Sequence, residues 1–188
     1  MKRAAILLGA IALGTGACSD SPSSPSSTGS RFVLRLSASQ FAAGQALLVT
    51  VSRVRVFRSD RDFIDVPLTN GAPQITCDLK KLQSVDGELA AGGLTPAQYT
   101  DVRVQIQSMT LYLDNPSPDI CTASVRIPSG RSTPIALPSN EIQIGGGFTI
   151  ESGADTVMRI GLNSEQSIRA GSGGSYTFTP VISVLGAG

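Results

Sequence analysis

The chain has 188 residues, and 15 lysines and arginines against 14 aspartates and glutamates give it a formal net charge of +1. This charge is too evenly balanced for a nucleic-acid-binding surface, and a hydrophobic content of 41% separates the chain from disordered proteins. The chain contains no histidine and no tryptophan. Because histidine is the commonest general base and metal ligand, we expect neither an enzyme nor a cofactor.

The first 17 residues have the layout of a cleaved export signal. Lys2 and Arg3 supply a positive start, and an apolar run then leads to small residues that end at Cys18. The run is too short for a membrane-spanning helix, which needs about 20 apolar residues. Two alternatives remain: an ordinary secretory signal, and a bacterial lipoprotein signal, which resembles Leu-Ala/Ser-Gly/Ala-Cys with Thr15 in the place of leucine. We favour the second, in which cleavage of residues 1–17 makes Cys18 the lipid-bearing N-terminus.

Residues 18–30 form a predicted flexible tether. Serine, proline, glycine and threonine follow the cysteine with a single charge, and such a segment buries too little apolar surface to fold. Ser19 follows the cysteine where an aspartate is associated with inner-membrane retention in lipoproteins of double-membrane bacteria. We therefore expect an exported protein that is anchored through its lipid to the cell envelope, at the outer membrane. A single folded domain is predicted over residues 31–186.

Apolar and polar residues alternate in the first half of this domain, as they do in strands with one buried face. In the longest of these strands the apolar phase slips by one residue at Ser52-Arg53, as at a β-bulge. The predicted elements of this half are strands at 32–36, 47–57 and 63–68, a polar turn at 59–62, and either a strand end or one helical turn at 77–82.

The second half repeats the pattern after a glycine- and alanine-rich segment at 88–94. A long strand begins after the turn at 95–98, and its apolar phase shifts near Gln107-Ser108, which predicts a second bulge. The last strand is predicted to run unbroken over 175–185, with Val184 on its apolar face. The remaining predicted strands of this half lie at 122–127, 133–137, 141–144, 147–150 and 155–162.

About ten strands with frequent turn signals predict an all-β fold, a single antiparallel β-sandwich of the immunoglobulin-like kind. Its core should hold large apolar side chains, each contributing about 1.5–3 kcal/mol on burial. The predicted core residues are Val54, Val56, Val102, Val104, Ile106, Ile160, Leu162, Phe178 and Ile182.

Two cysteines remain in the mature domain, Cys77 and Cys121. In an oxidising compartment an even pair suggests a disulfide, and the alternative is two buried free thiols. A disulfide would close a loop of about 45 residues, which the chain-entropy model values at about 4 kcal/mol.

Asp60, Asp62 and Asp65 are weak candidates for a calcium site. Three carboxylates within six residues could offer oxygen ligands to Ca²⁺. Arg58 and Arg61 offset their charge, however, and no glycine allows the sharp loop of an EF-hand. A solvated turn is the simpler interpretation, so the sequence predicts no metal site.

Other groups give no catalytic pattern. Ser167 has no histidine partner, which a nucleophilic serine usually requires. Scattered acids could supply the carboxylate pair of a glycosidase, but nothing in their spacing selects any two of them. These acids are Asp101, Asp114, Asp119, Glu141 and Glu151.

Several phrases of the sequence together resemble a family of bacterial lipoproteins known as domain of unknown function 4382. They are VTVSRVRVFRS at 49–59, CDLKKL at 77–82, GGLTPAQYTDVRVQI at 92–106, RIPSG at 126–130 and NSEQSIRAGSGGSYTFTPVI at 163–182. The Leu-x-Pro-x-x-Tyr turn at 94–99 also resembles that of transthyretin-like and carboxypeptidase-regulatory-like sandwiches, with Ala97 where those carry glycine. The resemblance implies a β-sandwich and an envelope address, and it implies no activity. Family aspartates are replaced near 37–39 and at Gly161 and Asn163, so a cation-binding role is not carried over.

The sequence thus predicts a lipid-anchored, non-catalytic binding or adhesion module whose ligand is an unknown protein or glycan. For a glycan, the predicted contact loops are 58–62, 114–120 and 128–132. An alternative is a structural or assembly subunit that pairs through an exposed strand edge. A glycan-active enzyme is a third, less favoured alternative.

Overall fold

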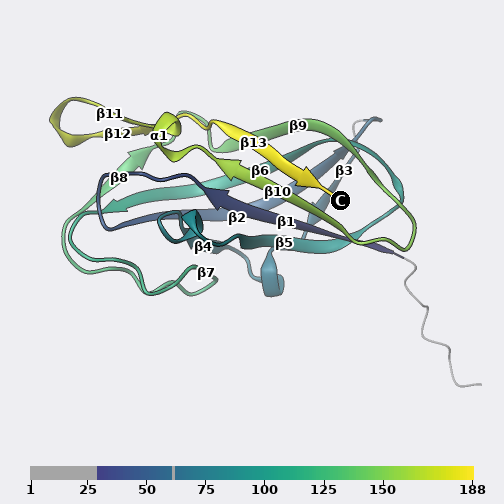
Figure 1. Ribbon diagram of the computed structural model, residues 1–188, viewed down its shortest axis with the longest axis horizontal. Coiled ribbons are helices and arrows are strands. Elements are labelled where there is room, and N and C mark those ends of the chain that lie inside the picture. Colours follow the sequence, from purple (N-terminus) through teal and green to yellow (C-terminus); the bar gives the residue numbers. More distant parts are fainter. Residues whose placement is uncertain (1–28, 61) are drawn as a thin grey trace, which may run out of the picture.

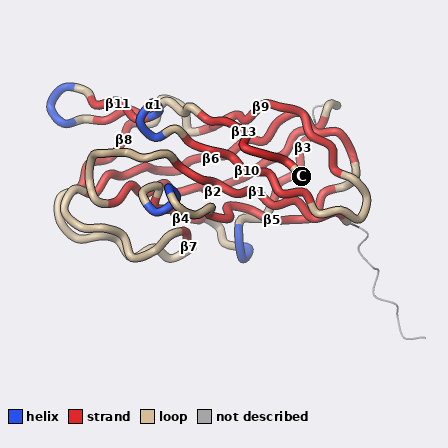
Figure 2. Tube along the Cα trace, viewed as in Figure 1, coloured by secondary structure: helices blue, strands red, loops and turns tan. Residues whose placement is uncertain are grey.

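The computed structural model describes residues 29–60 and 62–188, which form two β-sheets packed around one apolar core (Figure 1). Strands make up most of the described chain, and helix is confined to short turns (Figure 2). The predicted all-β sandwich is therefore confirmed. The predicted signal peptide, Cys18 and the tether up to residue 28 lie outside the described residues.

The smaller sheet has four strands, with the N-terminal strand in its interior. In spatial order these are β13 (Ile182–Ala187), β10 (Thr156–Leu162), β1 (Ser30–Ala38) and β5 (Gly87–Leu94).

The larger sheet has nine strands and is built around a long central pair. Its main path is β11 (Ile168–Ala170), β12 (Tyr176–Phe178), β8 (Ser132–Ala136), β6 (Ala97–Tyr112), β2 (Ala46–Arg58), β4 (Ile75–Asp78) and β7 (Cys121–Thr122). Off this path, β3 (Phe63–Val66) pairs with β2, and β9 (Glu141–Ile150) pairs with β6. The helical turns are α1 (Ser164–Ser167) and the 3₁₀ turns Thr69–Gly71, Lys81–Gln83 and Ser172–Gly174.

The two sheets are mixed, which corrects the prediction of a purely antiparallel sandwich. β1 runs parallel to β10, with Phe32 opposite Thr156 and Ala38 opposite Leu162. β12 also runs parallel to β8. Alternation along a strand reports which face is buried, but it contains no information about the direction of the neighbouring strand.

The two predicted bulges lie opposite each other in the β2–β6 pair. Thr50 faces Ser108 and Val51 faces Ile106, so Gln107 is an extra residue on β6. Arg53 then faces Gln105, so Ser52 is an extra residue on β2. Both strands therefore change side-chain phase at the same level, and their apolar side chains stay in the core on either side of it. All predicted core residues are buried except Ile182, which is partly buried.

Four strand predictions are corrected by the structure. Only Cys121–Thr122 of the predicted strand 122–127 is paired, because the following residues fold into a loop in which Arg126 binds Asp119. The predicted strand 175–185 is split at Pro180 into β12 and β13, because proline lacks the N–H that a strand ladder needs. The two resulting strands belong to different sheets. Val184 is accordingly 42% exposed. The glycine- and alanine-rich segment forms β5, and 141–150 is one strand with a bulge at its glycines.

An aromatic stack links the two sheets at one end of the core. The ring of Phe148 on β9 lies 5.5 Å from Phe32 on β1 and 5.5 Å from Tyr99 on β6, both nearly parallel to it. The Tyr99 hydroxyl donates to the Thr95 carbonyl at 2.9 Å, which satisfies a polar atom of a residue that is 1% exposed. The Leu-x-Pro-x-x-Tyr spacing of the turn before β6 is thus explained by a hydroxyl that reaches back to its own turn.

The sandwich is closed along one edge and open along the other. On the closed edge Leu68 bridges to Ala90 of β5, and the Ala91 N–H donates to the Pro67 carbonyl at 3.0 Å. On the open edge β13 lies beside β9 (Figure 1), yet each has only one hydrogen-bonded neighbour within the described chain, β10 and β6 respectively. We call this open edge the β9–β13 seam.

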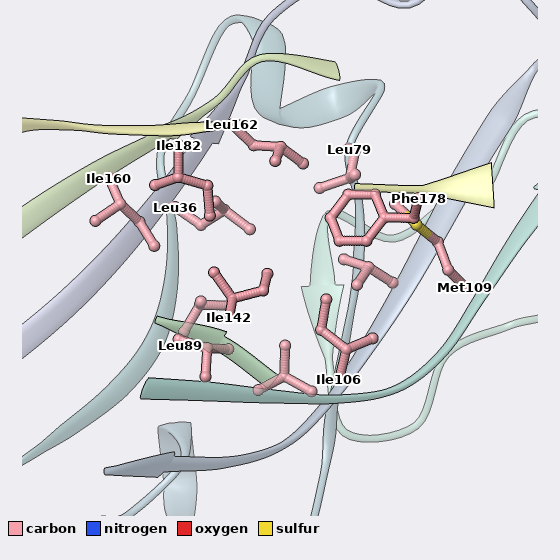
Figure 3. Close-up of a pocket in the computed structure, with 13 residues that line it drawn as sticks. Leu36, Leu79, Leu89, Ile106, Met109, Ile142, Ile160, Leu162, Phe178 and Ile182 are labelled. Atoms are coloured by element: carbon pink, nitrogen blue, oxygen red, sulfur yellow. The ribbon is translucent and has the colours of Figure 1, made fainter. Parts of the chain in front are cut away.

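The core contains a small apolar cavity between the sheets (Figure 3). Its volume is about 20 Å³, which is about the size of one water molecule, and its walls offer no polar partner to a water. Ile142 and Ile182, which line the cavity, also line the seam on its outer side. The cavity is too small for a ligand, so a binding site must lie on the surface.

Candidate functional site

Cys77 and Cys121 are joined by a disulfide in the structure, with their Cα atoms 4.0 Å apart. They face each other in the β4–β7 pair. Cys77 is fully buried, whereas Cys121 begins the outer strand of the pair. The disulfide fixes the long segment between β6 and β8 to the body of the larger sheet.

The three calcium candidates do not converge. Asp60 pairs with Arg58 at 3.3 Å, and Asp65 pairs with Arg53 at 3.8 Å. The Asp62 N–H donates to the Asp60 carboxylate at 3.2 Å, which is the geometry of a polar turn. Across residues 29–60 and 62–188, no three histidine, cysteine, aspartate or glutamate side chains are grouped closely enough to hold a metal ion.

Two of the scattered acids are held by arginines in the segment that the disulfide fixes. Asp114 binds Arg131 at 2.7 Å and Asp119 binds Arg126 at 3.0 Å. Hydrogen bonds from these arginines lower the pKa of Asp114 and of Asp119 below the usual range. Both carboxylates are therefore ionised acceptors and are poor candidates for a general acid.

The predicted glycan loops do not form one surface. Loops 114–120 and 128–132 are neighbours, since the Asn115 side chain donates to the Ser129 carbonyl at 2.9 Å. The turn at 58–62 lies at the opposite end of the sandwich, because it follows the far end of β2, where Arg58 faces Tyr99. A single ligand contacting all three loops would have to span the length of β2.

A cluster of arginine and phenylalanine side chains lies on the outer face of the larger sheet, and sequence reasoning missed it. Arg103 packs over the Phe57 ring at 4.0 Å, and Arg55 packs over the Phe63 ring at 5.3 Å. Glu141 binds both arginines, at 3.0 Å to Arg55 and 3.4 Å to Arg103. We call these five residues the arginine–phenylalanine cluster. Arg55 and Arg103 stand at outward positions of two alternating strands, but only the pairing register, in which they face each other, brings them together.

Arg103 also binds Asp101 at 2.9 Å, so the cluster brings together two of the acids considered for a glycosidase. Both carboxylates are occupied by the same guanidinium, which is a charge-balanced arrangement. Phe63 is 50% exposed at the rim of the cluster. The arrangement presents a half-exposed aromatic ring beside charges that are already paired.

The β9–β13 seam is the second feature that the sequence did not reveal. It forms a groove of about 200 Å³ between two strand edges. Four branched apolar side chains lie along it, two from each strand, and Gly145 lines it without a side chain of its own. The lining residues are Ile142, Gln143, Ile144, Gly145, Pro180, Ile182 and Val184.

A wider hollow of about 440 Å³ lies at the end of the sandwich next to the aromatic stack. Glu151 and Asp155 line it, together with Phe148. Both acids are exposed and neither has an ion-pair partner among the described residues. The hollow is shallow and offers no converging donors that would define a ligand.

One buried acid lies outside all of these surfaces. Asp78 is 1% exposed, and its Oδ1 atom accepts the N–H groups of Leu47 at 2.9 Å and Lys80 at 3.0 Å. Its Oδ2 atom has no partner. Burial raises the pKa of Asp78, although the two backbone hydrogen bonds act in the opposite direction. The role of this carboxylate is to hold the start of β2 against the end of β4.

Replacing Asp78 should change the pH dependence of stability. Because the folded state raises the pKa of Asp78, its contribution favours the folded state at low pH. That contribution declines as the pH rises from the ordinary value of about 3.9 through the higher folded pKa. We therefore expect Asp78→Asn to gain in unfolding free energy relative to the natural chain between pH 4 and pH 7, measured by urea unfolding.

Asp78→Ala is the matched variant for this test. It removes the acceptor of the buried Leu47 N–H and of the partly buried Lys80 N–H, and a buried donor left unpaired costs about 1–3 kcal/mol, so it should be less stable at every pH. A constant difference between Asp78→Asn and the natural chain over this pH range would contradict the assignment.

Within the described ranges, no helix is both long and apolar enough to cross a membrane. The described chain is instead an all-β sandwich with mixed sheets, an open strand edge and charge-paired surfaces. A family model described as a domain of unknown function (DUF4382) matches residues 29–180, and the chain belongs to this family. Comparison with curated proteins and with solved structures gave no match to either.

Proposed function

We propose that this protein is a non-catalytic binding module held at the bacterial cell envelope, on the outer membrane, by lipid attached to Cys18. The N-terminal pattern of positive start, apolar run and small residues before a cysteine supports the anchor. The polar segment that follows supports a tether that holds the domain away from the membrane.

The single observation that carries the binding role is the state of the carboxylates. Four of the five acids considered for a glycosidase, Asp101, Asp114, Asp119 and Glu141, are each engaged by an arginine at 2.7–3.4 Å, and the fifth, Glu151, lies in an exposed hollow. Catalytic acids and bases need a free proton-transfer position, whereas paired charges provide a fixed, complementary contact surface. The outer face of the larger sheet and the open edge then remain as places for a partner, which is a protein or a glycan.

The anchor is tested by replacing its cysteine. In cells fed a labelled palmitate analogue, the natural chain should carry label and fractionate with membranes. Cys18→Ser should lose the label and be recovered in the soluble fraction. Globomycin, which blocks lipoprotein signal cleavage, should make the natural chain accumulate uncleaved. A natural chain that matures unlabelled in the presence of globomycin would overturn the proposed anchor.

A second candidate function is a structural subunit that assembles through strand-edge pairing. It is favoured by the two edge strands β9 and β13, each with one neighbour. Sedimentation of the soluble Cys18→Ser chain distinguishes the candidates. Concentration-dependent oligomers would favour assembly, and a monomer up to millimolar concentration would favour the binding module.

A further inference from the structure

We propose that the outer face of the larger sheet binds a neutral oligosaccharide, across the four neighbouring strands β3, β2, β6 and β9. This inference rests on the proposed binding role, and it names the site and the chemical class of the ligand. It does not depend on the lipid anchor. It also places the glycan on a sheet face instead of on the three predicted loops, which do not form one surface.

Strand register brings the outward side chains of these strands together in rows. Phe57 and Phe63 belong to these rows and not to the apolar core, so the rows lie on the outside of the sandwich. We call the side chains of these rows the four-strand face. The rows are Asp65–Arg55–Arg103–Gln143, Phe63–Phe57–Asp101–Gly145 and Arg53–Gln105–Glu141.

The composition of the four-strand face favours a sugar over a protein. Its side chains are guanidinium, carboxylate, amide and phenyl groups, and it contains neither a lysine nor an aliphatic side chain. The centre of a protein–protein interface is depleted of charged residues, whereas most side chains of this face are charged. An oligosaccharide presents hydroxyl groups that both donate and accept hydrogen bonds, and it can therefore use the donors and the acceptors of the face together.

The charges of the four-strand face are balanced. Each of its arginines pairs with an acid of the same face, at N–O distances of 3.8, 3.0 and 2.9 Å. The face therefore has no net charge to attract an acidic or a basic ligand, and a charged ligand would have to compete with an existing ion pair. The pairs are Arg53 with Asp65, Arg55 with Glu141, and Arg103 with Asp101.

The ion pairs also fix the polar groups in position. Arg103 lies over the Phe57 ring at 4.0 Å and donates to Asp101 at 2.9 Å and to Glu141 at 3.4 Å. These bonds use only some of the N–H donors that a guanidinium carries. A side chain that is already ordered loses little conformational entropy when a ligand binds, so sugar hydroxyls can accept from Arg103 at a small entropic cost.

Phe63 adds an apolar contact at one end of the face. Its side chain is 50% exposed even though Arg55 lies over the ring at 5.3 Å, so part of the ring remains open to a ligand. A sugar ring presents C–H groups on one side, and the negative face of a phenyl ring attracts them. Gln143 is exposed at the other end, on β9. Four strands at the usual spacing span about 14 Å, which accommodates several sugar units.

The first experiment applies the soluble Cys18→Ser chain to an array of neutral and acidic oligosaccharides. We expect neutral oligosaccharides to be retained. Their affinity should change less than about twofold when the salt concentration is raised from 0.05 M to 0.5 M, because hydrogen bonds to uncharged hydroxyls are little affected by screening. Binding that depends on ion pairs with an acidic ligand would weaken strongly over the same range.

Variants of Phe63 test the apolar contact. Phe63→Ala should weaken binding of the retained oligosaccharide at least about fivefold, whereas Phe63→Tyr keeps the ring and should bind normally. Ile127→Ala is the matched control, because Ile127 is 63% exposed in the segment that the disulfide fixes and lies outside the four-strand face. It should bind as the natural chain does.

Variants of Gln143 test the hydrogen-bonding part of the face. Gln143→Ala removes donors and an acceptor from an exposed position and should weaken binding at least about fivefold. Gln83→Ala is its control, because Gln83 is exposed in the 3₁₀ turn beside β1 and β4 and should not contact the ligand. In a titration followed by nuclear magnetic resonance, the side-chain amide signals of Gln105 and Gln143 should shift, and that of Gln83 should stay in place.

The inference is overturned if no neutral oligosaccharide is retained, or if either Phe63→Ala or Gln143→Ala binds normally. Retention of acidic glycans alone, with affinity that falls steeply in salt, would overturn the neutral class of ligand. A protein that crosslinks to this face in cells, with no glycan retained on the array, would overturn the sugar and leave the proposed binding module standing. The proposed anchor fails separately, through loss of lipid labelling.

Discussion

Opening the Cys77–Cys121 disulfide is expected to lower the free energy of unfolding by about 4 kcal/mol. The two cysteines are separated by 44 positions, and a loop of this length restricts the unfolded chain by that amount in the chain-entropy model. The segment between β6 and β8 would also lose its covalent attachment, leaving the Asp114–Arg131 and Asp119–Arg126 pairs to hold it.

The measurement is urea unfolding of the Cys18→Ser chain with and without reductant, which changes no side chain of the domain. Cys77→Ala combined with Cys121→Ala should reproduce the reduced value. The same double variant should not respond to reductant, which controls for effects of the reagent itself. A difference below about 1 kcal/mol would show that the unfolded chain is already restrained in this region.

Replacing Phe32 by alanine should destabilise the domain by about 3–5 kcal/mol, the range for a buried phenylalanine. Phe32 is fully buried, and its ring is one end of the stack that continues through Phe148 to Tyr99. The substitution would leave a cavity between the sheets and remove one of two faces against which Phe148 packs. The midpoint of urea unfolding should fall with little change in its slope.

Phe63→Ala is the control for this loss, because it removes the same atoms from a ring that is 50% exposed. It should cost no more than about 1 kcal/mol, through its contacts with Arg55 and Phe57. Equal costs for the two variants would contradict the position of Phe32 in the core.

The sequence correctly predicted the features that are determined within a single strand, such as its position, its buried face and its bulges. Alternation identified β1, β2, β6 and β10 and the faces they bury, and the two phase slips located bulges at Ser52 and Gln107. It could not predict which strands would be neighbours, because pairing between β1 and β10 joins residues far apart in the chain. The break at Pro180 could have been predicted from the sequence, because proline cannot donate a hydrogen bond to a strand ladder. The alternation of apolar and polar residues on both sides of Pro180 favoured one continuous strand instead.

The candidate sites show the same limit. Arg55 and Arg103 stand at outward positions of alternating strands, so their place on the outer face of a sheet could be predicted. Their partner Glu141 could not, because only the register of β6 with β9 brings it beside Arg103. The seam was hidden for a different reason. A missing neighbour leaves no mark in the sequence of a strand, and only the complete strand order reveals it.

The interior position of β1 has a consequence for how the chain folds. One edge of β1 is completed by β5, but the other waits for β10, whose first paired residue, Thr156, lies opposite Phe32. Contacts of such high sequence separation slow folding, because a long loop must close before they form. The second edge of β1 is not covered until the chain has been made through Leu162, and the smaller sheet is not complete until β13 has been made through Ala187. The domain therefore completes its smaller sheet only after nearly the whole chain has been synthesised, so this sheet cannot serve as a template for the strands that precede its last one.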